Sequence, residues 1–573
     1  MKKNFVKSRW FFTMLLFVTT MIMPSMMLAK SITPTRPEGN GRAKPYQISN
    51  REELYWFARL VNGTLPNVLR DKSANAILTK DIIVNTGVLD AVNKGKVSES
   101  DFIEWEPIGK HDSYDAVYTG IFDGQGHTIS GLYFNDTKAS YVGLFGYIGD
   151  DNYGYKGRIF NVGVSDSYFQ FDKQGGGVCG LIDHGGILQN CSNSSTVIGK
   201  NNDSRAGGVC GDNNGTVRDC KNTGSVSGQN DVGGVCGFSA GTVKSCYNTG
   251  SVHGTGTHVG GVCGSNYIST TYSGTITNCY YLENTATGGM EGKDVPGKAE
   301  KMSIEPFKSG EMAWLLNGKG LGEQVWGQQL GIDPSPVPGS AYKVIKAAQG
   351  DKDANGNDTY WATFSNLKND ATLSVPSESG RTLNVYNATV SGGKLTLTQR
   401  SDDQVAKGEG VLLKTNGEYV NAKANETNDL TKASSDENHL VATPAKAKTV
   451  IADAGYKLYR LTYNNAAKEG LGFYLSVYKA NNSYNGTRLK ATPGKAYLKV
   501  SENEAKDPSS AALARSFVFG GGNETTGIEG ITIMGTDVQR HNTLEGIFDL
   551  QGRKISNPTK GIYIKNNKKV VIK

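Results

Sequence analysis

The sequence predicts an all-β protein with a parallel β-solenoid and short capping helices, an antiparallel β-sandwich, and a small C-terminal β-domain. Three observations predict this order. A Cys-bearing, Gly-rich repeat fills the middle of the chain, short alternating strands without helical periodicity follow it, and a separate strand-and-turn pattern ends it. Gly makes up 73 of the 573 residues, nearly twice the ~7% of an average protein, which indicates many tight turns.

The repeat has the form Gly-Gly-Val-Cys-Gly and begins at Gly176, Gly207, Gly233 and Gly260. Apolar positions inside one unit are eight or nine residues apart, at Val209, Val217, Val226 and Val235. Three short strands in a unit of 26 residues, each bounded by Gly or Asn turns, fit a coil with three sides. One coil cannot bury its own apolar face, but stacked coils share a continuous core. The repeat therefore predicts a parallel β-solenoid.

Short helices are expected at both ends of the solenoid. Ser49-Asn50-Arg51-Glu52 matches a capping box, and apolar residues follow it at helical spacing, at Leu54, Phe57, Ala58 and Val61. A helix here would cover the open strand edges of the first coil. Ser309 to Asn317 predicts a second helix, with Gly318 as its stop and one apolar side formed by Met312, Ala313 and Leu316.

Residues 44–340 resemble the GLUG-motif proteins, which are secreted or surface proteins common in Bacteroidetes. The resemblance is carried by the Gly-Gly-hydrophobic-x-Gly units, by Phe-Asp-Gly-Gln-Gly-His-Thr-Ile at 122–129 and by Gly-Leu-Phe-Gly at 143–146. It implies an adhesive or structural role for the repeats. Because such repeats also occur beside peptidase domains, it also calls for a search for peptidase motifs.

All eight cysteines lie in the repeats and form two columns: Cys179, Cys210, Cys236 and Cys263 in one, and Cys191, Cys220, Cys246 and Cys279 in the other. An even number in an exported chain is compatible with disulfides, and stacked coils would bring the Cα atoms to about 4.8 Å. The preceding coil has Phe145 and Val162 at the two positions. Positions that accept Phe or Val favour buried, reduced thiols. A metal site is disfavoured because no Cys-x-x-Cys pair occurs.

Residues 341–519 predict the antiparallel β-sandwich, with seven or more short strands and no helix. The expected strands are Tyr360–Phe364, Thr382–Tyr386, Lys394–Thr398, Gly410–Lys414, Lys457–Tyr463, Phe473–Tyr478, Ala496–Val500 and a last one at Ser516–Phe519. Residues 520–527 are Gly-rich and predict a flexible linker.

Residues 528–573 resemble the C-terminal sorting domain of the type IX secretion pathway. The resemblance is carried by Ile-Phe-Asp-Leu-Gln-Gly-Arg-Lys at 547–554, Lys-Gly-Ile-Tyr-Ile at 560–564 and the lysines near the end. It implies recognition by an export machinery and attachment or release at the outer membrane. An ordinary terminal pair of β-hairpins is the alternative interpretation.

Residues 1–29 have the pattern of a cleaved signal peptide. Four basic residues precede an apolar stretch from Trp10 to Met23, and the small residue Ala29 marks the expected cleavage site. A retained anchor is the alternative, but Thr13, Thr19, Thr20 and Pro24 interrupt the stretch. Residues 30–43 are expected to be a linker. The formal charge is +7, of which the leader carries +4, so the mature chain has too little positive charge for a nucleic-acid binder.

Motifs that could carry catalysis lack the context that their chemistry needs. Gly237-Phe238-Ser239-Ala240-Gly241 matches a serine-hydrolase elbow, but it falls on a turn between solenoid strands. None of the seven His residues is followed by Glu, which excludes the usual zinc-peptidase motif. Residues 351–358 resemble the start of a calcium loop, yet its twelfth position is Ala362 where the bidentate Glu should be. A β-turn explains the same residues.

These observations predict an exported, non-enzymatic, adhesin-like repeat protein, secreted or held on the outer-membrane surface of a Gram-negative bacterium. No catalytic, cofactor-binding or metal-binding residue is predicted. The expected partners are a host surface or matrix protein or a glycan, together with the export machinery; no nucleic acid and no membrane span after signal cleavage are expected. The alternative is a carbohydrate-active protein, either a glycan-binding module or a polysaccharide-lyase-like β-helix. Such lyases group Asp with Lys or Arg on one face, whereas Arg205, Arg218 and Lys244 are scattered in this sequence.

Overall fold

The computed structural model describes residues 30–95, 101–110, 117–149, 156–268, 274–319, 324–353, 355–376, 380–446, 448–464, 470–476, 486–506 and 516–518, and the backbone of four strands between 547 and 572. The chain divides into two compact units, which meet in sequence near residue 341. The expected signal peptide and the linker at 520–527 lie outside the described residues.

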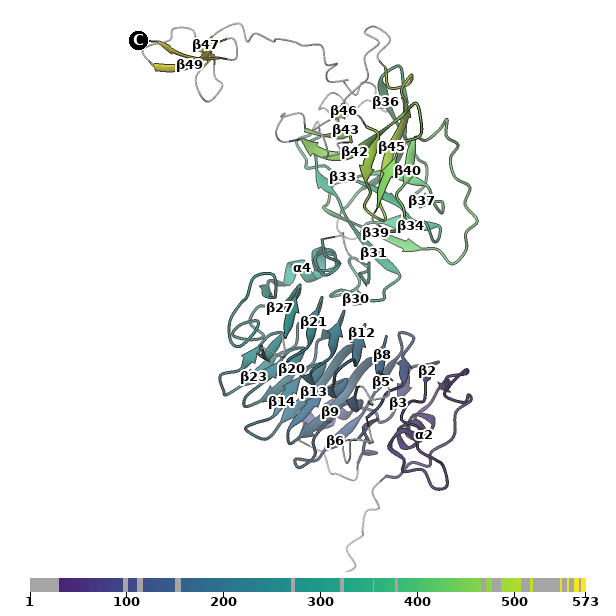
Figure 1. The fold of residues 1–573 in the computed structure, drawn as a ribbon, viewed down its shortest axis with the longest axis vertical. Helices are drawn as coiled ribbons and strands as arrows, with labels where there is room; N and C mark the ends of the chain where they lie inside the picture. The colour runs from purple at the N-terminus through teal and green to yellow at the C-terminus, as the bar shows by residue number, and fades with distance from the viewer. Residues whose placement is uncertain are drawn as a thin grey trace, which may run out of the picture. The chain divides into compact units, whose positions relative to one another are not determined.

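The first unit is a parallel β-solenoid, as predicted (Figure 1). One sheet, called sheet A here, runs through the whole stack, and all of its strands pair in parallel. In order they are β1 (Tyr46–Ile48), β2 (Ala76–Leu78), β4 (Ile121–Asp123), β8 (Arg158–Phe160), β12 (Ile187–Gln189), β16 (Thr216–Arg218), β21 (Thr242–Lys244) and β26 (Thr275–Thr277).

A second side, sheet B, contains eleven strands. Two long strands of the earlier coils, β9 (Gly163–Phe171) and β13 (Ser192–Gly199), are replaced in later coils by pairs of short ones. The remaining strands are β3 (Ile82–Ile83), β5 (Thr128–Ser130), β6 (Tyr133–Asn135), β17 (Lys221–Asn222), β18 (Val226–Gly228), β22 (Tyr247–Asn248), β23 (Val252–Gly254), β27 (Cys279–Leu282) and β28 (Ala299–Met302).

Two narrower sheets complete the later coils. Sheet C contains β7 (Phe145–Ile148), β11 (Cys179–Ile182), β15 (Cys210–Asn213), β20 (Cys236–Ser239) and β25 (Cys263–Asn266). Sheet D contains β10 (Gln174–Gly176), β14 (Arg205–Gly207), β19 (Val232–Gly233) and β24 (Val259–Gly260).

The predicted count of three strands per coil is therefore wrong in detail. Val217 and Val226 lie in strands as expected, but Val209 and Val235 occupy the bend between a strand of sheet D and a strand of sheet C. All four side chains are buried. The apolar spacing located the inward positions correctly, and the double glycine beside each of these valines lets the chain bend where a longer strand was expected.

The repeated glycines are needed because the interior leaves no space for a Cβ atom. A Cβ on Gly208 would lie 2.3 Å from Cγ of Asn222, and one on Gly234 would lie 2.4 Å from Cγ of Asn248. The glycine of the Asn-Thr-Gly-Ser-Val segment is equally constrained, because a Cβ on Gly250 would lie 1.8 Å from the carbonyl oxygen of Gly224. These contacts explain why the repeat keeps glycine at fixed positions in every coil.

Those glycines face a ladder of buried asparagines, Asn193, Asn222 and Asn248, each at most 1% exposed. Nδ2 of Asn193 donates to Oδ1 of Asn222, and Nδ2 of Asn222 donates to Oδ1 of Asn248, both over 2.8 Å. The Asn222 side chain also bonds both backbone groups of Gly224, at 2.9 and 3.2 Å. The ladder satisfies polar groups at a turn that no water reaches.

The N-terminal cap is the helix α2 (Arg51–Asn62), and its predicted apolar side, Leu54, Phe57, Ala58 and Val61, is fully buried. The capping box is displaced by one residue from the prediction. Oδ1 of Asn50 accepts from the Glu53 amide at 2.9 Å, and the Glu53 carboxylate accepts from the Ser49 amide at 2.7 Å. Asn and Ser are both strong N-cap residues, so the position decides: Asn50 directly precedes the first helical residue, Arg51, and Ser49 does not.

Residues 30–43 contact this cap. The Thr35 amide donates to the Glu52 carbonyl at 3.1 Å, Glu38 forms a bridge with Gln47, and the Arg36 guanidinium lies 5.7 Å from the Trp56 ring centroid. A further short helix that the sequence did not predict, α3 (Val88–Asn93), receives its cap from another coil. The Asp166 carboxylate accepts from the Gly87 and Leu89 amides, each at 3.0 Å.

At the C-terminal end of the solenoid, the structure has two short helices where the sequence predicted one. Gly310, with φ of 94°, separates α4 (Ile304–Ser309) from α5 (Glu311–Leu316) because its left-handed conformation cannot continue a helix. The predicted apolar side of Met312, Ala313 and Leu316 is buried. This segment, with the hairpin β29 (Trp326–Gly327) and β30 (Val337–Pro338), covers sheet B through Tyr247, whose ring lies 5.5 Å from Phe307 and 5.3 Å from Trp326.

The second unit is built from antiparallel sheets, as predicted, but in three layers. The first sheet contains β31 (Tyr342–Lys346), β39 (Tyr419–Ala424), β34 (Ala371–Ser374) and β37 (Gln404–Val405). The middle sheet contains β32 (Ala348–Gln349), β33 (Tyr360–Ser365), β38 (Gly410–Thr415), β35 (Leu383–Ser391) and β36 (Lys394–Gln399). The last contains β40 (Leu440–Ala442), β45 (Ala496–Ser501), β42 (Tyr456–Asn464), β43 (Gly470–Leu475) and β46 (Ser516–Val518), and β41 (Thr449–Ile451) pairs β44 (Arg488–Lys490) beside it.

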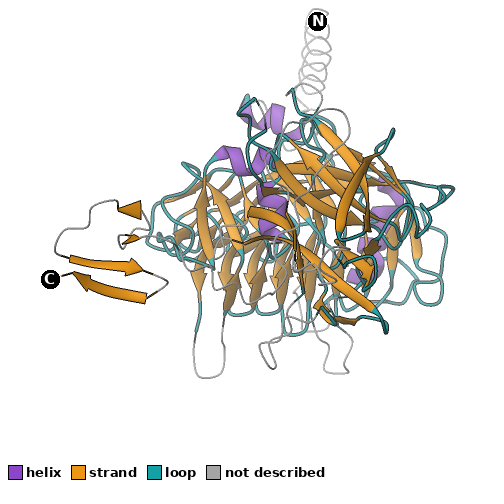
Figure 2. Ribbon diagram, turned by 90° about the horizontal axis from the view of Figure 1, so that it is seen from above, coloured by secondary structure: helices purple, strands orange, loops and turns teal. Residues whose placement is uncertain are grey.

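The middle sheet buries both of its faces. Val411 and Leu413 of β38 pack into the core shared with the first sheet, whereas Leu412 between them packs into the core shared with the last sheet. Helices are few throughout the described residues (Figure 2). In the C-terminal segment, β47 (Ile547–Phe548), β48 (Lys554–Ile555), β49 (Gly561–Lys565) and β50 (Lys568–Ile572) form one antiparallel sheet.

The asparagine ladder leads to a stability prediction. Replacing Asn222 by Ala removes the bonds to Gly224 and to both neighbouring asparagines, which should destabilise the protein by about 1–3 kcal/mol because buried backbone groups lose their partners. Asn202→Ala, at an exposed turn of the same coil, should change stability by less than about 0.5 kcal/mol. Thermal unfolding followed by circular dichroism measures both, and equal effects of the two substitutions would contradict a structural role for the ladder.

Candidate functional site

The serine-hydrolase pattern at Gly237–Gly241 is a structural turn. Ser239 ends β20 and is fully buried. Its hydroxyl accepts from Nδ2 of Asn213 at 3.0 Å and donates to the Gly241 carbonyl at 3.4 Å. A nucleophile needs an exposed hydroxyl beside a base on a strand-turn-helix, and this residue has neither the exposure nor the context.

In the predicted turn at 351–358, the Asp353 and Asp358 carboxylates bond to groups of the same turn. Asp353 accepts from the Asn355 amide at 2.9 Å and from the Asn357 amide at 2.8 Å, and Nζ of Lys352 lies 2.8 Å from Oδ1 of Asp358. These bonds are those of an Asx turn. Within the described residues, no group of three or more His, Cys, Asp and Glu side chains is placed to hold a metal ion.

The two cysteine columns stack as predicted. Cys179 pairs with Phe145 on one side and with Cys210 on the other, and the register continues through Cys236 to Cys263. All eight cysteines are free thiols and fully buried. Burial raises the pKa of six thiols well above the ordinary value, those of Cys210, Cys220, Cys236, Cys246, Cys263 and Cys279. A thiol held protonated in this way is a poor nucleophile and a poor metal ligand.

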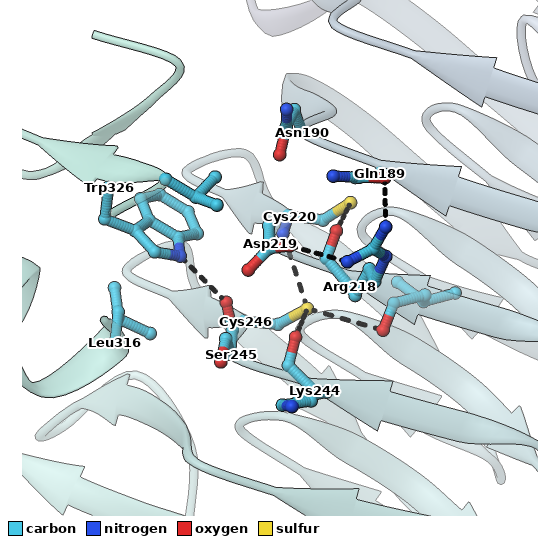
Figure 3. A network of polar contacts seen from close by, with 12 residues as sticks. Gln189, Asn190, Arg218, Asp219, Cys220, Lys244, Ser245, Cys246, Leu316 and Trp326 are labelled. Carbon is cyan, nitrogen blue, oxygen red and sulfur yellow. Dashed lines mark hydrogen bonds and ion pairs between the residues drawn. The ribbon is translucent and has the colours of Figure 1, made fainter. Parts of the chain in front are cut away.

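The second column has a role beyond filling space (Figure 3). Each of its cysteines follows a residue with positive φ at the corner between sheets A and B, such as Asp219 at 56° or Ser245 at 51°. The Cys220 thiol donates to the Arg218 carbonyl at 3.1 Å, and the Cys246 thiol donates to the Lys244 carbonyl at 3.2 Å. The Cys246 sulfur also accepts from the Cys220 amide at 3.4 Å. Cysteine is thus a small apolar residue that still satisfies the backbone of the corner.

The corner also anchors the C-terminal cap. Nε1 of Trp326 donates to the Ser245 carbonyl at 3.2 Å, and Arg218 on the outer side of sheet A donates to Oε1 of Gln189 at 2.6 Å (Figure 3). Arg218 and Lys244 are in register on neighbouring strands. Neither is joined to Arg205, which lies in sheet D.

The outward side chains of sheets C and D form a cluster around Arg205, called the Arg205 face here. Asp212 and Phe238 are direct neighbours in the strand register of sheet C, and Arg205 begins the sheet D strand β14. The Arg205 guanidinium binds the Asp212 carboxylate, lies 3.9 Å from the Asp231 carboxylate and stacks 4.0 Å from the Phe238 ring centroid. These residues are up to 33 positions apart in the sequence, and they become neighbours because successive coils stack on one another.

The carboxylates of this face are buried unevenly. Desolvation raises the pKa of Asp212, although the Arg205 charge opposes the shift, and Oδ1 of Asp212 has no hydrogen-bond partner among the described residues. Desolvation also raises the pKa of Asp231, whose Oδ1 lies 3.0 Å from Nδ1 of the exposed His258. Asp212 is only 5% exposed, so it cannot reach a polymeric substrate as an acid or a base.

Aromatic rings lie along the same face. Tyr267, which is 47% exposed, stacks on Phe238 with 6.0 Å between centroids and 29° between planes. Tyr141 and Tyr147 form a second stacked pair at 6.0 Å, and the Tyr147 hydroxyl donates to Asp183 at 2.7 Å. Tyr147 and Phe238 belong to the same column of sheet C, three coils apart, which is about 14 Å. Tyr147 is buried at 3% exposure and Tyr141 is half-buried, so the exposed aromatic surface of this face is mainly that of Tyr267.

The thiols can be counted by alkylation. At a pH of about 8.5, where a free cysteine is half ionised, iodoacetamide should leave the folded protein unlabelled because all eight thiols are buried. In denaturant without reductant, mass spectrometry should find eight labels. Labels that require prior reduction would show disulfides, and labelling of the folded protein would contradict the buried positions.

Comparison with protein-family models finds no match. Over 195 residues the chain is 28% identical to Halomucin of Haloquadratum walsbyi (strain DSM 16790 / HBSQ001), an alignment that covers 34% of this chain and 2% of the much longer Halomucin. A crystal structure from Bacteroides ovatus, described as a "putative immunoglobulin A1 protease", aligns with 54% of this chain and 95% of that chain, with 18% identity and a TM-score of 0.34. In the described residues, no helix combines the length and the apolar character that crossing a membrane requires.

Proposed function

We propose that this chain is an exported, non-enzymatic repeat protein whose solenoid binds a glycan or a glycan-bearing host surface through the Arg205 face. The observation that carries the proposal is the exposed ring of Tyr267 stacked on Phe238. Sugar rings stack on such aromatic surfaces, and the adjoining charged groups can bond their hydroxyls. Of the second aromatic pair, the half-buried Tyr141 could add a further contact for an extended chain.

The export part of the proposal rests on the sequence. The signal-like residues 1–29, the resemblance of 44–340 to GLUG-motif proteins and the resemblance of 528–573 to a type IX sorting domain agree with a secreted or outer-membrane location. The similarity to a segment of Halomucin supports a surface repeat protein. A host matrix protein as the ligand remains part of the same proposal, as does an interaction of the C-terminal segment with the export machinery.

One arrangement favours the alternative of a lyase-like enzyme. Arg205, Asp231 and His258 lie together on one face of a parallel solenoid, and Asp231 has a raised pKa. A lyase needs a base that reaches the sugar and a cation that binds its acidic group. Here the Arg205 guanidinium is already held between two carboxylates and an aromatic ring, which favours a structural role for the cation.

A binding array tests the proposal. Residues 30–573 should bind one or more immobilised glycans or matrix proteins without altering them, and Tyr267→Ala should weaken the affinity about tenfold or more because a central aromatic contact is lost. Tyr456→Ala, which removes an exposed tyrosine of the second unit, is the matched control and should leave the affinity unchanged.

The same samples separate binding from catalysis. Chromatography of each bound polysaccharide after long incubation should return the intact polymer. Release of unsaturated sugars that is lost in Asp231→Asn would establish the enzyme instead, and binding that is insensitive to Tyr267→Ala would remove the Arg205 face as the site.

A further inference from the structure

A second surface site lies on sheet A, among the early coils. Here the structure has a pocket of about 370 Å³ lined by Arg42, Ser73, Asn75, Thr119, Ile121, Lys156 and Arg158. This volume falls within the range of small-molecule sites, about 300–1,000 Å³. The lining comes from strands β4 and β8 and from the segments that lead into β1, β2, β4 and β8. It does not overlap the Arg205 face on sheets C and D.

The solenoid register fixes the walls of this pocket. Ile121 and Arg158 are paired residues of neighbouring parallel strands, so their side chains project about 4.8 Å apart from the same face. The Ile121 amide donates to Oδ1 of Asn75 at 2.8 Å. This bond fixes the Asn75 side chain beside strand β4. Gly185 leaves room for the stem of Lys156, because a Cβ there would lie 2.8 Å from Cδ of the lysine. The lysine is thereby laid along the surface beside the pocket.

The charge of the lining is positive. Three of the seven lining residues are cationic, and none of those seven is acidic. Arg42 is oriented by Asp71 at 2.8 Å and by the Ser73 hydroxyl at 2.9 Å. Lys156 and Arg158 form no ion pair within the described part of the chain, and Nδ2 of Asn75 has no hydrogen-bond partner there. By contrast, the cation of the other face, Arg205, is neutralised by two carboxylates.

We propose that this pocket binds an oxyanion, the carboxylate or sulfate group of an acidic polysaccharide. Arg158 can bond such a group with two parallel N–H donors, and Lys156 adds a second charge. The free amide of Asn75 and the Ser73 hydroxyl lie beside the cations and suit sugar hydroxyls. This site is distinct from the Arg205 face, and either site can exist without the other.

Polymers of known charge test the inference with residues 30–573. Dextran sulfate offers only sulfate, polygalacturonate offers only carboxylate, and neutral dextran offers neither. We expect one of the charged polymers to bind, with an affinity that falls as salt rises because the contacts are charged, and we expect no binding to dextran. The polymer that binds identifies the group.

The double variant Lys156→Gln/Arg158→Gln should weaken this binding about tenfold or more, since two charge-assisted contacts are lost. Lys200→Gln/Lys244→Gln removes the same charge from exposed solenoid positions outside the pocket and should change the affinity less than about twofold. Both variants should keep the wild-type melting temperature, because the replaced side chains are exposed.

Three outcomes would overturn the inference: no binding to either charged polymer, equal weakening by the two double variants, or equal affinity for a DNA duplex, which would show charge attraction without a pocket. Tyr267→Ala distinguishes this site from the proposed function. It should leave binding of the charged polymer unchanged, whereas failure of the glycan array alone would leave the pocket intact.

Discussion

The spacing between successive coils governs the rest of the solenoid. Backbone hydrogen bonds between parallel strands hold neighbouring coils about 4.8 Å apart, so every inward side chain lies directly above its own equivalent. In the regular later coils, each repeated interior position therefore accepts a copy of itself at that distance. Glycine does so where an asparagine fills the space opposite, as at Gly208 and Asn222. Asparagine does so because its amide donates to the next carbonyl oxygen and thereby forms a ladder. Cysteine does so as a small side chain that bonds the backbone of its own corner.

Much of this architecture could be predicted because it repeats. The register of the cysteine columns follows from the coil period, and Phe145 at the same position identified it as apolar before any contact was known. The count of strands per coil could not be predicted from burial, because Val235 at a bend is as deeply buried as Val217 in a strand. Helix α3 was missed for a different reason: its cap is Asp166, some 77 residues away from the amide it binds, and local patterns do not contain that information.

The two candidate sites illustrate the same limit. Arg205, Arg218 and Lys244 looked equally isolated in the sequence, yet only Arg205 joins two carboxylates and an aromatic ring. The 26-residue offset between Asp212 and Phe238 was a usable signal, since positions one period apart are neighbours. The sheet A pocket had no such signal, because its walls come from the irregular early coils. Outward side chains vary from coil to coil, and this variation allows a uniform scaffold to present specific surfaces.

Under the proposed function, the inward residues maintain the fold and the outward residues recognise the ligand. The most direct measurement is an alanine scan of one coil, residues 232–257, in which melting temperature and ligand affinity are recorded for every variant. The account predicts that inward substitutions such as Cys236→Ala and Asn248→Ala lower the melting temperature without changing the affinity of the folded protein, and that Phe238→Ala lowers the affinity. A loss of affinity at Cys236 or Asn248 with unchanged stability would contradict it.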